Sequence, residues 1–216
     1  MTKVGILPTP LQKKLPPRSV ERLSKYRRLL SNLDAGNREF IFSHDLAQLL
    51  NLTPEQVRRD LMLIGLTGNR RKGYSVKALI ELIGKTIDKE EGHNVAIIGI
   101  GNLGKAITAF IRKARTKLNI VAAFDVDASK INRETAGVTC YNISQIPYMV
   151  EKLNISIVIL TVPSDVVKEI TTSLINSGVK GILNFTSVHL DVPPGVYLKD
   201  YDIITSLEEI GFFIKQ

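Results

Sequence analysis

The chain contains a glycine-rich motif with the spacing GxGxxG. It follows an apolar run, residues 95–98, and precedes a helix-like segment, residues 105–115. In such a strand–turn–helix context the first glycine permits a tight turn, the second lets a pyrophosphate approach the backbone, and the third lets the helix pack on the strand. Free N–H groups at the positive end of the helix would bind the phosphates. The motif consists of Gly99, Ile100, Gly101, Asn102, Leu103 and Gly104.

A carboxylate follows the motif at the distance expected for a dinucleotide site. The apolar run 120–124 ends in Asp125, 26 residues after Gly99. A carboxylate at the end of the second strand can accept hydrogen bonds from both hydroxyls of the adenosine ribose, and it would repel a 2′-phosphate. The pattern therefore favours NAD(H) over its phosphorylated form. Asp127 is a second candidate, and an ordinary loop carboxylate is the structural alternative.

Two further apolar runs also end in polar or aromatic residues. Thr161, Val162 and Pro163 follow the run 155–160, and Asn184 and Phe185 end the run after it. In open α/β sheets ligands bind at the carboxyl ends of strands. Asn184 and Phe185 could frame a nicotinamide through an amide hydrogen bond and an aromatic wall. Turn chemistry and core packing are the alternative roles for these two residues.

From residue 94 onward, strand-like and helix-like segments alternate, which predicts a Rossmann-type parallel sheet with helices on both faces. The last segment, residues 206–215, has an apolar stripe at helical spacing and would complete the core or dock on a partner subunit. The expected strands are 95–98, 119–125, 155–161 and 180–185, and the expected helices are 103–116, 144–152 and 164–177.

Charge separates the chain into two parts. Among its 216 residues, the first 90 contain 17 basic and 9 acidic residues, whereas the remainder contains 12 of each, so the net charge of +8 belongs to the first part. A basic part joined to a neutral one suggests a polyanion partner for the first and a small ligand for the second. No apolar run approaches the roughly 20 residues of a membrane span, and no apolar signal core is visible. The single cysteine, Cys140, fits a cytoplasmic protein without disulfides.

The basic part has the plan of a winged helix-turn-helix. Ser19 is expected to cap a helix that ends near Leu33, and Ser43 a short helix over 44–50. After a turn, Thr53 would cap a third helix, residues 54–64, with proline at its first position. In such a fold the second helix of the motif enters the major groove and the hairpin contacts phosphate or the minor groove.

Several residues of this part are predicted to contact DNA. Arg59 points away from the apolar stripe of the third helix, and a glycine-bounded cationic turn follows this helix. The alternative is a charged surface that contacts only solvent. The predicted DNA-binding residues are Ser43, Thr53, Gln56, Arg58, Arg59, Arg70, Arg71, Lys72 and Tyr74.

No catalytic set accompanies the predicted dinucleotide site. A nicotinamide dehydrogenase needs an acid or base for the proton that accompanies hydride. Of the three histidines, only His189 follows a strand of the sheet, and it lacks an arginine partner for an anionic substrate. These observations predict a regulator rather than an enzyme. The competing hypotheses are a small NAD-dependent oxidoreductase and a module that binds coenzyme A or another nucleotide.

Together these motifs resemble the Rex family of redox-sensing transcriptional repressors over nearly everything after residue 15. The resemblance implies a homodimer with a swapped C-terminal helix. It also implies that the dimer binds palindromic operators when NADH is low and releases them when NADH binds. NAD⁺ would compete with NADH without causing full release. The similar stretches are 56–61, 99–104, 124–127, 160–163 and 181–185.

Composition, charge and the expected elements predict a domain plan, and the resemblance implies residues that link the domains. The plan is a flexible terminus (1–17), a winged-helix domain (18–88), an NAD(H)-binding domain (89–203) and a dimerisation helix (204–216). Arg28 and Asp202 match positions associated with linking the domains. Phe110 lies where some members have a tyrosine near the partner's nicotinamide, and the turn before Tyr74 has fewer glycines than is usual in the family.

Overall fold

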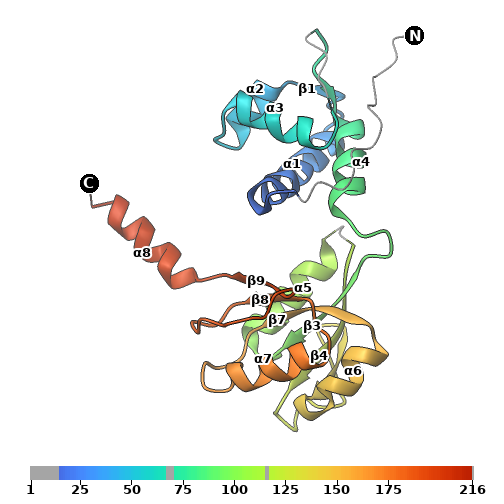
Figure 1. Ribbon diagram of the computed structural model, residues 1–216, viewed down its shortest axis with the longest axis vertical. Helices are drawn as coiled ribbons and strands as arrows, with labels where there is room; N and C mark the ends of the chain where they lie inside the picture. The colour runs from blue at the N-terminus through green and yellow to red at the C-terminus, as the bar shows by residue number, and fades with distance from the viewer. Residues whose placement is uncertain (1–14, 67–70, 115–116, 216) are drawn as a thin grey trace. The chain divides into compact units, whose positions relative to one another are not determined.

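The computed structural model describes residues 15–66, 71–114 and 117–215. The chain divides into two compact units, Met1–Glu90 and Glu91–Gln216, and each is described by itself (Figure 1). Among the described residues, none of the helices has both the length and the apolar character needed to cross a membrane.

The N-terminal unit is a small helical domain with a two-stranded ribbon. Its strands pair in antiparallel register, with Ile41 opposite Tyr74. Leu23, Leu30 and Val57 are fully buried in one apolar core that the helices share. This arrangement confirms the predicted helix-turn-helix plan. The elements are α1 (Pro17–Ala35), β1 (Phe40–Ile41), α2 (Ser43–Leu49), α3 (Pro54–Leu63), β2 (Tyr74–Ser75) and α4 (Val76–Ile87).

Two of the predicted helix starts are wrong. Helix α1 begins at Pro17, because a proline suits the first turn of a helix, where its missing N–H costs nothing. Ser19 is therefore buried inside the helix, where its hydroxyl accepts a hydrogen bond from Arg22 at 3.1 Å. Likewise Ser43 is the first residue of α2 and the extended residue Phe42 precedes it. The third prediction is confirmed, since Thr53 Oγ1 caps α3 by accepting from the N–H of Gln56 at 3.2 Å.

The C-terminal unit is built on a seven-stranded sheet of order β5-β6-β4-β3-β7-β8-β9. All neighbouring strands run parallel except β5 and β6, which form a hairpin. The strands are β3 (His93–Ile98), β4 (Leu118–Asp125), β5 (Glu134–Thr135), β6 (Val138–Asn142), β7 (Ile155–Leu160), β8 (Gly181–Asn184) and β9 (Tyr197–Asp200).

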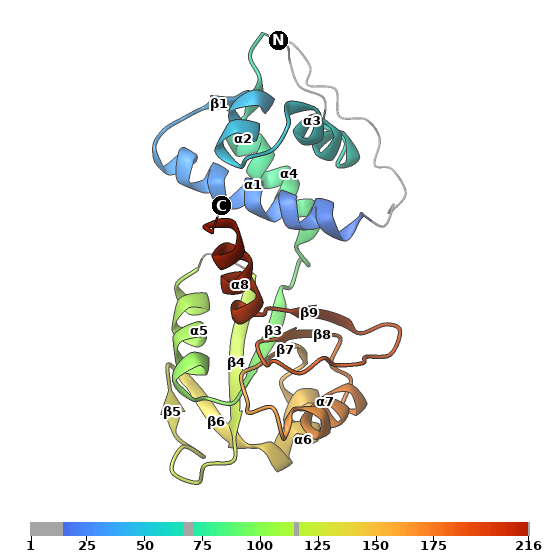
Figure 2. The same cartoon turned by 90° about the vertical axis from the view of Figure 1, so that its left-hand side faces the viewer.

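Helices cover both faces of this sheet, as predicted (Figure 2). Because successive residues of a strand point to opposite faces, Ala96 and Ile98 pack in the core beneath α6 and α7, whereas Val95 and Ile97 pack beneath α5. The helices are α5 (Asn102–Lys113), α6 (Ile146–Lys152), which the 3₁₀ turn η1 (Ile143–Gln145) precedes, and α7 (Val167–Asn176).

Three strands and the start of the last helix differ from the sequence-based prediction. Strands β5 and β6 form a short hairpin, and β9 is an edge strand with three of its four residues exposed, so none of them has the long apolar run of a buried parallel strand. Helix α8 (Ile203–Phe213) begins before residue 206 because Asp202 caps it. The carboxylate of Asp202 accepts hydrogen bonds from the N–H groups of Ile204 and Thr205, at 2.9 and 3.1 Å.

Candidate functional sites

The glycine loop between β3 and α5 is held from both sides. Gly99 adopts a φ of +89°, and a side chain there would lie 2.7 Å from the carbonyl oxygen of Thr161. Its N–H donates to Phe124 O at 2.7 Å, and its carbonyl accepts from the hydroxyl of Thr161 at 2.7 Å. The loop is therefore fixed by β4 on one side and by the end of β7 on the other.

The second and third glycines of the motif have different surroundings. A Cβ on Gly104 would overlap the carbonyl oxygen of Gly99, which shows how closely α5 packs on the loop. Gly101, in contrast, has open space around its Cα and directly precedes the first turn of α5. A backbone without side chains before a helix N-terminus is the arrangement that admits a pyrophosphate. The residues present therefore fit a dinucleotide.

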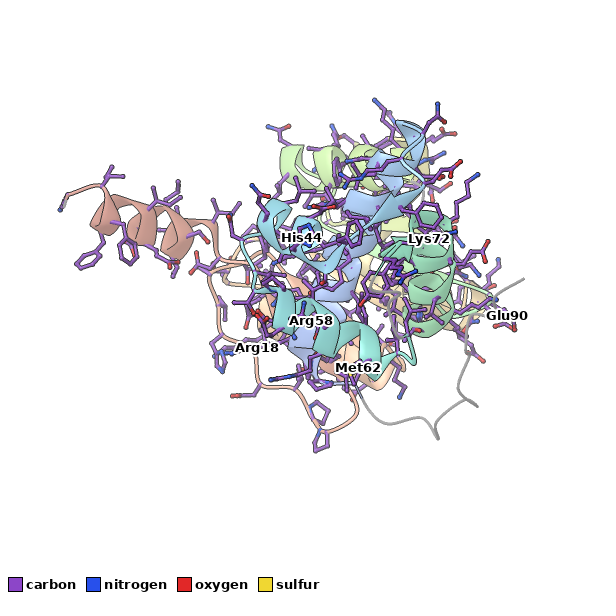
Figure 3. All side chains as sticks on the ribbon, turned by 90° about the horizontal axis from the view of Figure 1, so that it is seen from above. Arg18, His44, Arg58, Met62, Lys72 and Glu90 are labelled. Carbon is purple, nitrogen blue, oxygen red and sulfur yellow. The ribbon has the colours of Figure 1, made fainter. Side chains whose placement is uncertain are left out.

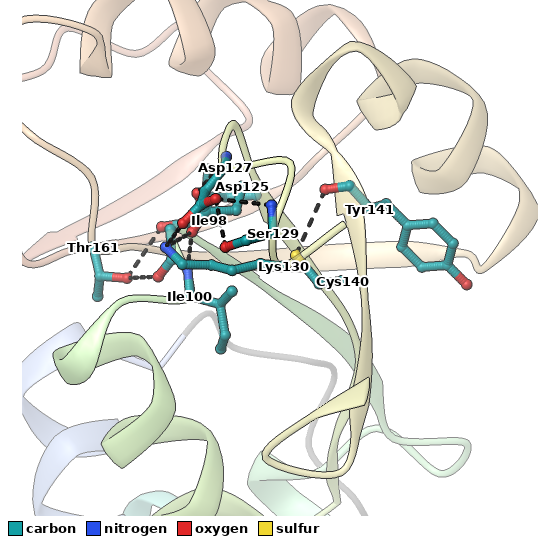
Figure 4. Close-up of polar contacts among 10 residues, drawn as sticks. Ile98, Ile100, Asp125, Asp127, Ser129, Lys130, Cys140, Tyr141 and Thr161 are labelled. Carbon is teal, nitrogen blue, oxygen red and sulfur yellow. Dashed lines mark hydrogen bonds and ion pairs between the residues drawn. The ribbon is translucent and has the colours of Figure 1, made fainter. Parts of the chain in front are cut away.

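Asp125 is buried at the carboxyl end of β4 and faces the glycine loop (Figure 4). Its Oδ2 accepts from the N–H of Ile100 at 3.0 Å and from the ammonium of Lys130 at 2.9 Å. Its Oδ1 accepts from the N–H of Asp127 at 3.0 Å. Burial alone would raise the pKa of Asp125, but the N–H of Asp127 and the Lys130 ammonium outweigh it and hold the pKa below its usual value. The group is a carboxylate at neutral pH.

Asn184 performs turn chemistry, the alternative that the sequence left open. Its amide NH₂ donates to Val188 O at 2.9 Å and to the Asp200 carboxylate at 2.8 Å. Its carbonyl oxygen accepts from both the N–H and the hydroxyl of Thr186. These four bonds use the whole hydrogen-bonding capacity of an amide, so the proposed bond from Asn184 to a nicotinamide is not supported.

Phe185 and the residues after β7 lie at the same edge of the sheet. Phe185 is half-buried, and its ring packs against Tyr201 with centroids 5.1 Å apart. Tyr201 is exposed, and the sequence analysis missed it because nothing in its spacing distinguishes it from an ordinary loop residue. Val162 is half-buried against Gly99, and Pro163 is exposed in the turn that leads to α7.

In the N-terminal unit, α3 carries two exposed arginines, Arg58 and Arg59, of which Arg58 is labelled in Figure 3. Arg58 is held in place, since it donates to Ser43 Oγ at 3.1 Å and to Glu55 at 2.6 Å. Arg59 is exposed beside it, and Gln56 is half-buried on the same helix. The structure therefore brings Ser43, from the start of α2, next to the predicted recognition helix.

The predicted cationic turn is described only in part. Arg71 and Lys72 are exposed, whereas Arg70 lies outside the described residues. Tyr74 was predicted to contact DNA, but the structure buries it in the core of the N-terminal unit, with 9% of its surface exposed. Side chains alternate between the two faces of the β1–β2 ribbon, and this alternation turns Tyr74 inward opposite Ile41.

A buried ion pair joins α3 to α1, and the sequence analysis missed it. Asp60 is 1% exposed and accepts two hydrogen bonds from Arg22, Nε to Oδ2 at 2.6 Å and Nη2 to Oδ1 at 2.7 Å. The hydroxyl of Tyr26 donates to the same carboxylate at 2.8 Å. Asp60 lies one residue after Arg59, so this network orients the helix that carries the candidate DNA contacts.

The three residues assigned to communication between domains are all on the surface. Arg28 is exposed on α1, and Phe110 is 70% exposed on α5. Asp202 caps α8, a local role that the sequence analysis did not include.

Comparison with protein families matches two parts of the chain. Residues 14–61 match a family described as "Putative DNA-binding protein N-terminus", and residues 90–188 match a family described as "CoA binding domain".

Curated proteins match nearly the whole chain. A "Redox-sensing transcriptional repressor Rex" of Anoxybacillus flavithermus is 36% identical over 205 residues, which cover 94% of this chain and 96% of that protein. One of Leuconostoc citreum is 37% identical, with 94% of each chain covered. The chain belongs to the Rex family.

Solved structures of a Rex-family repressor, RSP, agree with this assignment. RSP in complex with NADH is 26% identical, covering 94% of this chain and 95% of RSP, with a TM-score of 0.83. RSP in complex with NAD⁺ and operator DNA is 27% identical, covering 94% of each chain, with a TM-score of 0.84.

Membership of the Rex family decides between the three hypotheses. The relatives are transcriptional repressors, which confirms the prediction of a regulator rather than an oxidoreductase. The match to a CoA binding domain describes the kind of fold over residues 90–188.

Replacing Arg59 by alanine should weaken specific DNA binding. A bidentate base contact contributes roughly 1–3 kcal/mol, so we expect a loss of roughly 5- to 150-fold on a palindromic duplex selected from a random library with the wild-type protein. Lys85→Ala, which removes an exposed cation from the last turn of α4, is the matched control. Equal affinities for the Arg59 variant and the wild type would contradict the recognition-helix assignment.

Arg71→Ala and Lys72→Ala should instead each reduce the salt dependence of DNA binding. We expect the slope of log affinity against log salt concentration to become shallower by about 0.9 for each variant.

Proposed function

We propose that this protein is a homodimeric repressor that binds palindromic operator DNA when NADH is low and releases it when NADH binds. The observation that carries the proposal is a glycine loop held against a buried carboxylate, Asp125, in a chain that also carries two exposed arginines, Arg58 and Arg59, on α3. The relative RSP has been solved both with NADH and with NAD⁺ plus operator DNA. Because its partners are DNA and a nicotinamide dinucleotide, we place the protein in the cytoplasm.

Each part of the chain has a role in this mechanism. Residues 89–203 would bind NAD(H), with the N–H groups at the start of α5 facing the pyrophosphate and Asp125 facing the adenosine ribose. Residues 18–88 would bind DNA through α3 and the cationic turn. NADH supplies an uncharged ring where NAD⁺ carries a positive one, and NAD⁺ would compete without full release. The interdomain positions Arg28, Phe110 and Asp202 would transmit the difference.

Operator DNA should weaken NADH binding. A ligand shifts an equilibrium only through its different affinities for the two states, and the coupling is reciprocal. We expect the NADH affinity measured by calorimetry to fall by roughly 5- to 150-fold when saturating operator is present, with a smaller change for NAD⁺. A duplex of scrambled sequence at the same concentration is the control. Equal NADH affinities with and without operator would rule out the switch, and turnover of NADH with substrate would support an oxidoreductase instead.

The last helix supports the homodimer. All the large apolar side chains of α8 are exposed, from 47% for Ile203 to 65% for Ile204. Contiguous apolar surface of this kind marks an interaction site. A second copy of the chain fits the requirement of a palindromic operator for two recognition helices related by a two-fold axis. Residues 204–216 are therefore assigned to dimerisation.

Replacing Ile210 by aspartate should convert the dimer into a monomer. Ile210 is 57% exposed on α8, so the charge would cost little in the separate chain but would be buried in the interface. Sedimentation or light scattering should show a shift to half the mass, together with loss of operator binding. Glu208→Ala on the same helix is the control and should remain dimeric. A dimeric Ile210→Asp protein would contradict the assignment of α8.

A further inference from the structure

A lysine ammonium lies between two carboxylates at the carboxyl end of β4. Lys130 Nζ is 2.9 Å from Asp125 Oδ2 and 3.5 Å from Asp127 Oδ2 (Figure 4). The side chain of Lys130 is about a quarter exposed, whereas that of Asp125 is 9% exposed. A cation therefore lies where the proposed site would place the 2′ position of the adenosine ribose.

The hydrogen bonds of Asp125 leave little capacity for a ligand. A carboxylate offers about four acceptor positions. Ile100 N–H and Lys130 use two on Oδ2, and Asp127 N–H uses one on Oδ1. One position remains, which is enough for a single ribose hydroxyl. The Lys130 ammonium has three donors, and two of them face Asp125 and Asp127, so its third is available to the ligand.

We infer that Lys130 is a specificity-determining residue for the 2′ position of the ribose, and that its ion pair with Asp125 keeps it from binding a 2′-phosphate. The inference rests on the proposed dinucleotide site. Asp125 excludes a 2′-phosphate in two ways, through its own negative charge and by keeping the Lys130 ammonium paired. Lysine binds phosphate well as a point charge. Loss of the Asp125 carboxylate would therefore both remove a repulsive group and free a phosphate-binding cation.

The roles of the two residues can be separated by a double-mutant cycle in the full-length protein. The affinities of NADH and NADPH are measured by calorimetry for the wild type, Asp125→Asn, Lys130→Met and the double variant. We expect the wild type to prefer NADH and Asp125→Asn to shift the ratio towards NADPH by at least about tenfold, or ~1.4 kcal/mol. The double variant should lose most of that shift. If the shift is as large in the double variant as in Asp125→Asn, Lys130 has no part in specificity.

Two controls make the cycle specific for Lys130. Lys180→Met, in the Asp125→Asn background, removes a lysine directly before β8, at the opposite end of the strands, and should leave the shift intact. Lys130→Arg in that background keeps the charge and should also retain it. Thermal unfolding checks each variant, and Asp125→Ser replaces Asp125→Asn if the latter fails to fold.

The cycle also distinguishes this inference from the proposed function. A wild-type protein that binds neither NADH nor NADPH would overturn the dinucleotide site and this inference with it. A wild type that binds NADH, combined with additive effects of the two substitutions, would leave the site in place and overturn only the role of Lys130.

Discussion

Replacing Asp60 by alanine should destabilise the N-terminal unit by about 3 kcal/mol or more, because removing one partner of a buried ion pair leaves the other uncompensated. Arg22 would lose both of its bonds to the carboxylate and Tyr26 would lose the acceptor of its hydroxyl. Since the network joins α1 to α3, operator affinity should fall together with stability. Urea unfolding followed by circular dichroism measures the first effect and a gel shift the second.

Two comparisons test whether the Asp60 network is responsible. Glu81→Ala removes an exposed acid from α4 and should change stability by no more than about 0.5 kcal/mol. Tyr26→Phe removes one of the three donors and should cost roughly 1 kcal/mol. An Asp60→Ala protein as stable as Glu81→Ala would show that the ion pair contributes nothing to the fold.

The Asp60 network should also make stability depend on pH. Burial alone would raise the pKa of Asp60, but hydrogen bonds from Arg22 and Tyr26 outweigh it and keep the pKa below its usual value. A group with a lowered pKa stabilises the fold above its unfolded value, about 3.9, and this stabilisation is lost as the pH falls through the lower, folded value. The difference in stability between the wild type and Asp60→Ala should therefore shrink below about pH 4.

Replacing Gly104 by alanine should abolish NADH binding and destabilise the C-terminal unit. The added Cβ would overlap the carbonyl oxygen of Gly99, so α5 would have to move off the loop. Overpacking of this kind costs typically 1–3 kcal/mol, and the clash with backbone places Gly104→Ala at the upper end. A fluorescence titration with NADH and a thermal unfolding curve measure the two effects.

Gly101→Ala is the matched control for the third glycine. Gly101 has open space around it and a φ of −74°, which alanine adopts readily. The stability of the Gly101→Ala protein should stay within about 1 kcal/mol of the wild type. Its NADH affinity should fall at least about tenfold, because the added methyl group occupies the place of the pyrophosphate. If both variants lose stability equally, the close packing of α5 on the loop does not distinguish the two glycines.

Periodicity predicted the fold well where elements are buried and long. Strands β3, β4, β7 and β8 each contain an apolar stretch, because both faces of a parallel sheet are covered. Edge strand β9 has three of its four residues exposed and lacks such a run. Helix ends depend on local chemistry. Thr53 caps α3 as predicted, whereas α1 begins at Pro17 and not after Ser19, because proline is favoured in the first turn of a helix.

The candidate sites were predictable to the extent that spacing in one segment determines them. The glycine loop and Asp125 belong to one strand–helix–strand unit, so their proximity follows from its length. The Asp60 pair with Arg22, 38 residues apart, and the four bonds of Asn184 depend on tertiary packing. Lys130 was missed because a lone lysine in a loop carries no signal until its distance to Asp125 is known.

The glycine loop is held by the protein's own groups, through the carbonyl of Phe124 and the hydroxyl of Thr161. NADH and NAD⁺ share the same pyrophosphate and adenosine, so a rigid cradle contributes equally to the binding of both. A contribution that is equal for two ligands cannot bias one against the other. The glycine loop therefore strengthens the binding of NADH and NAD⁺ equally. It sets the total dinucleotide concentration at which the protein is occupied, whichever form is bound. The redox signal must be read at the other end of the ligand, where the two forms differ.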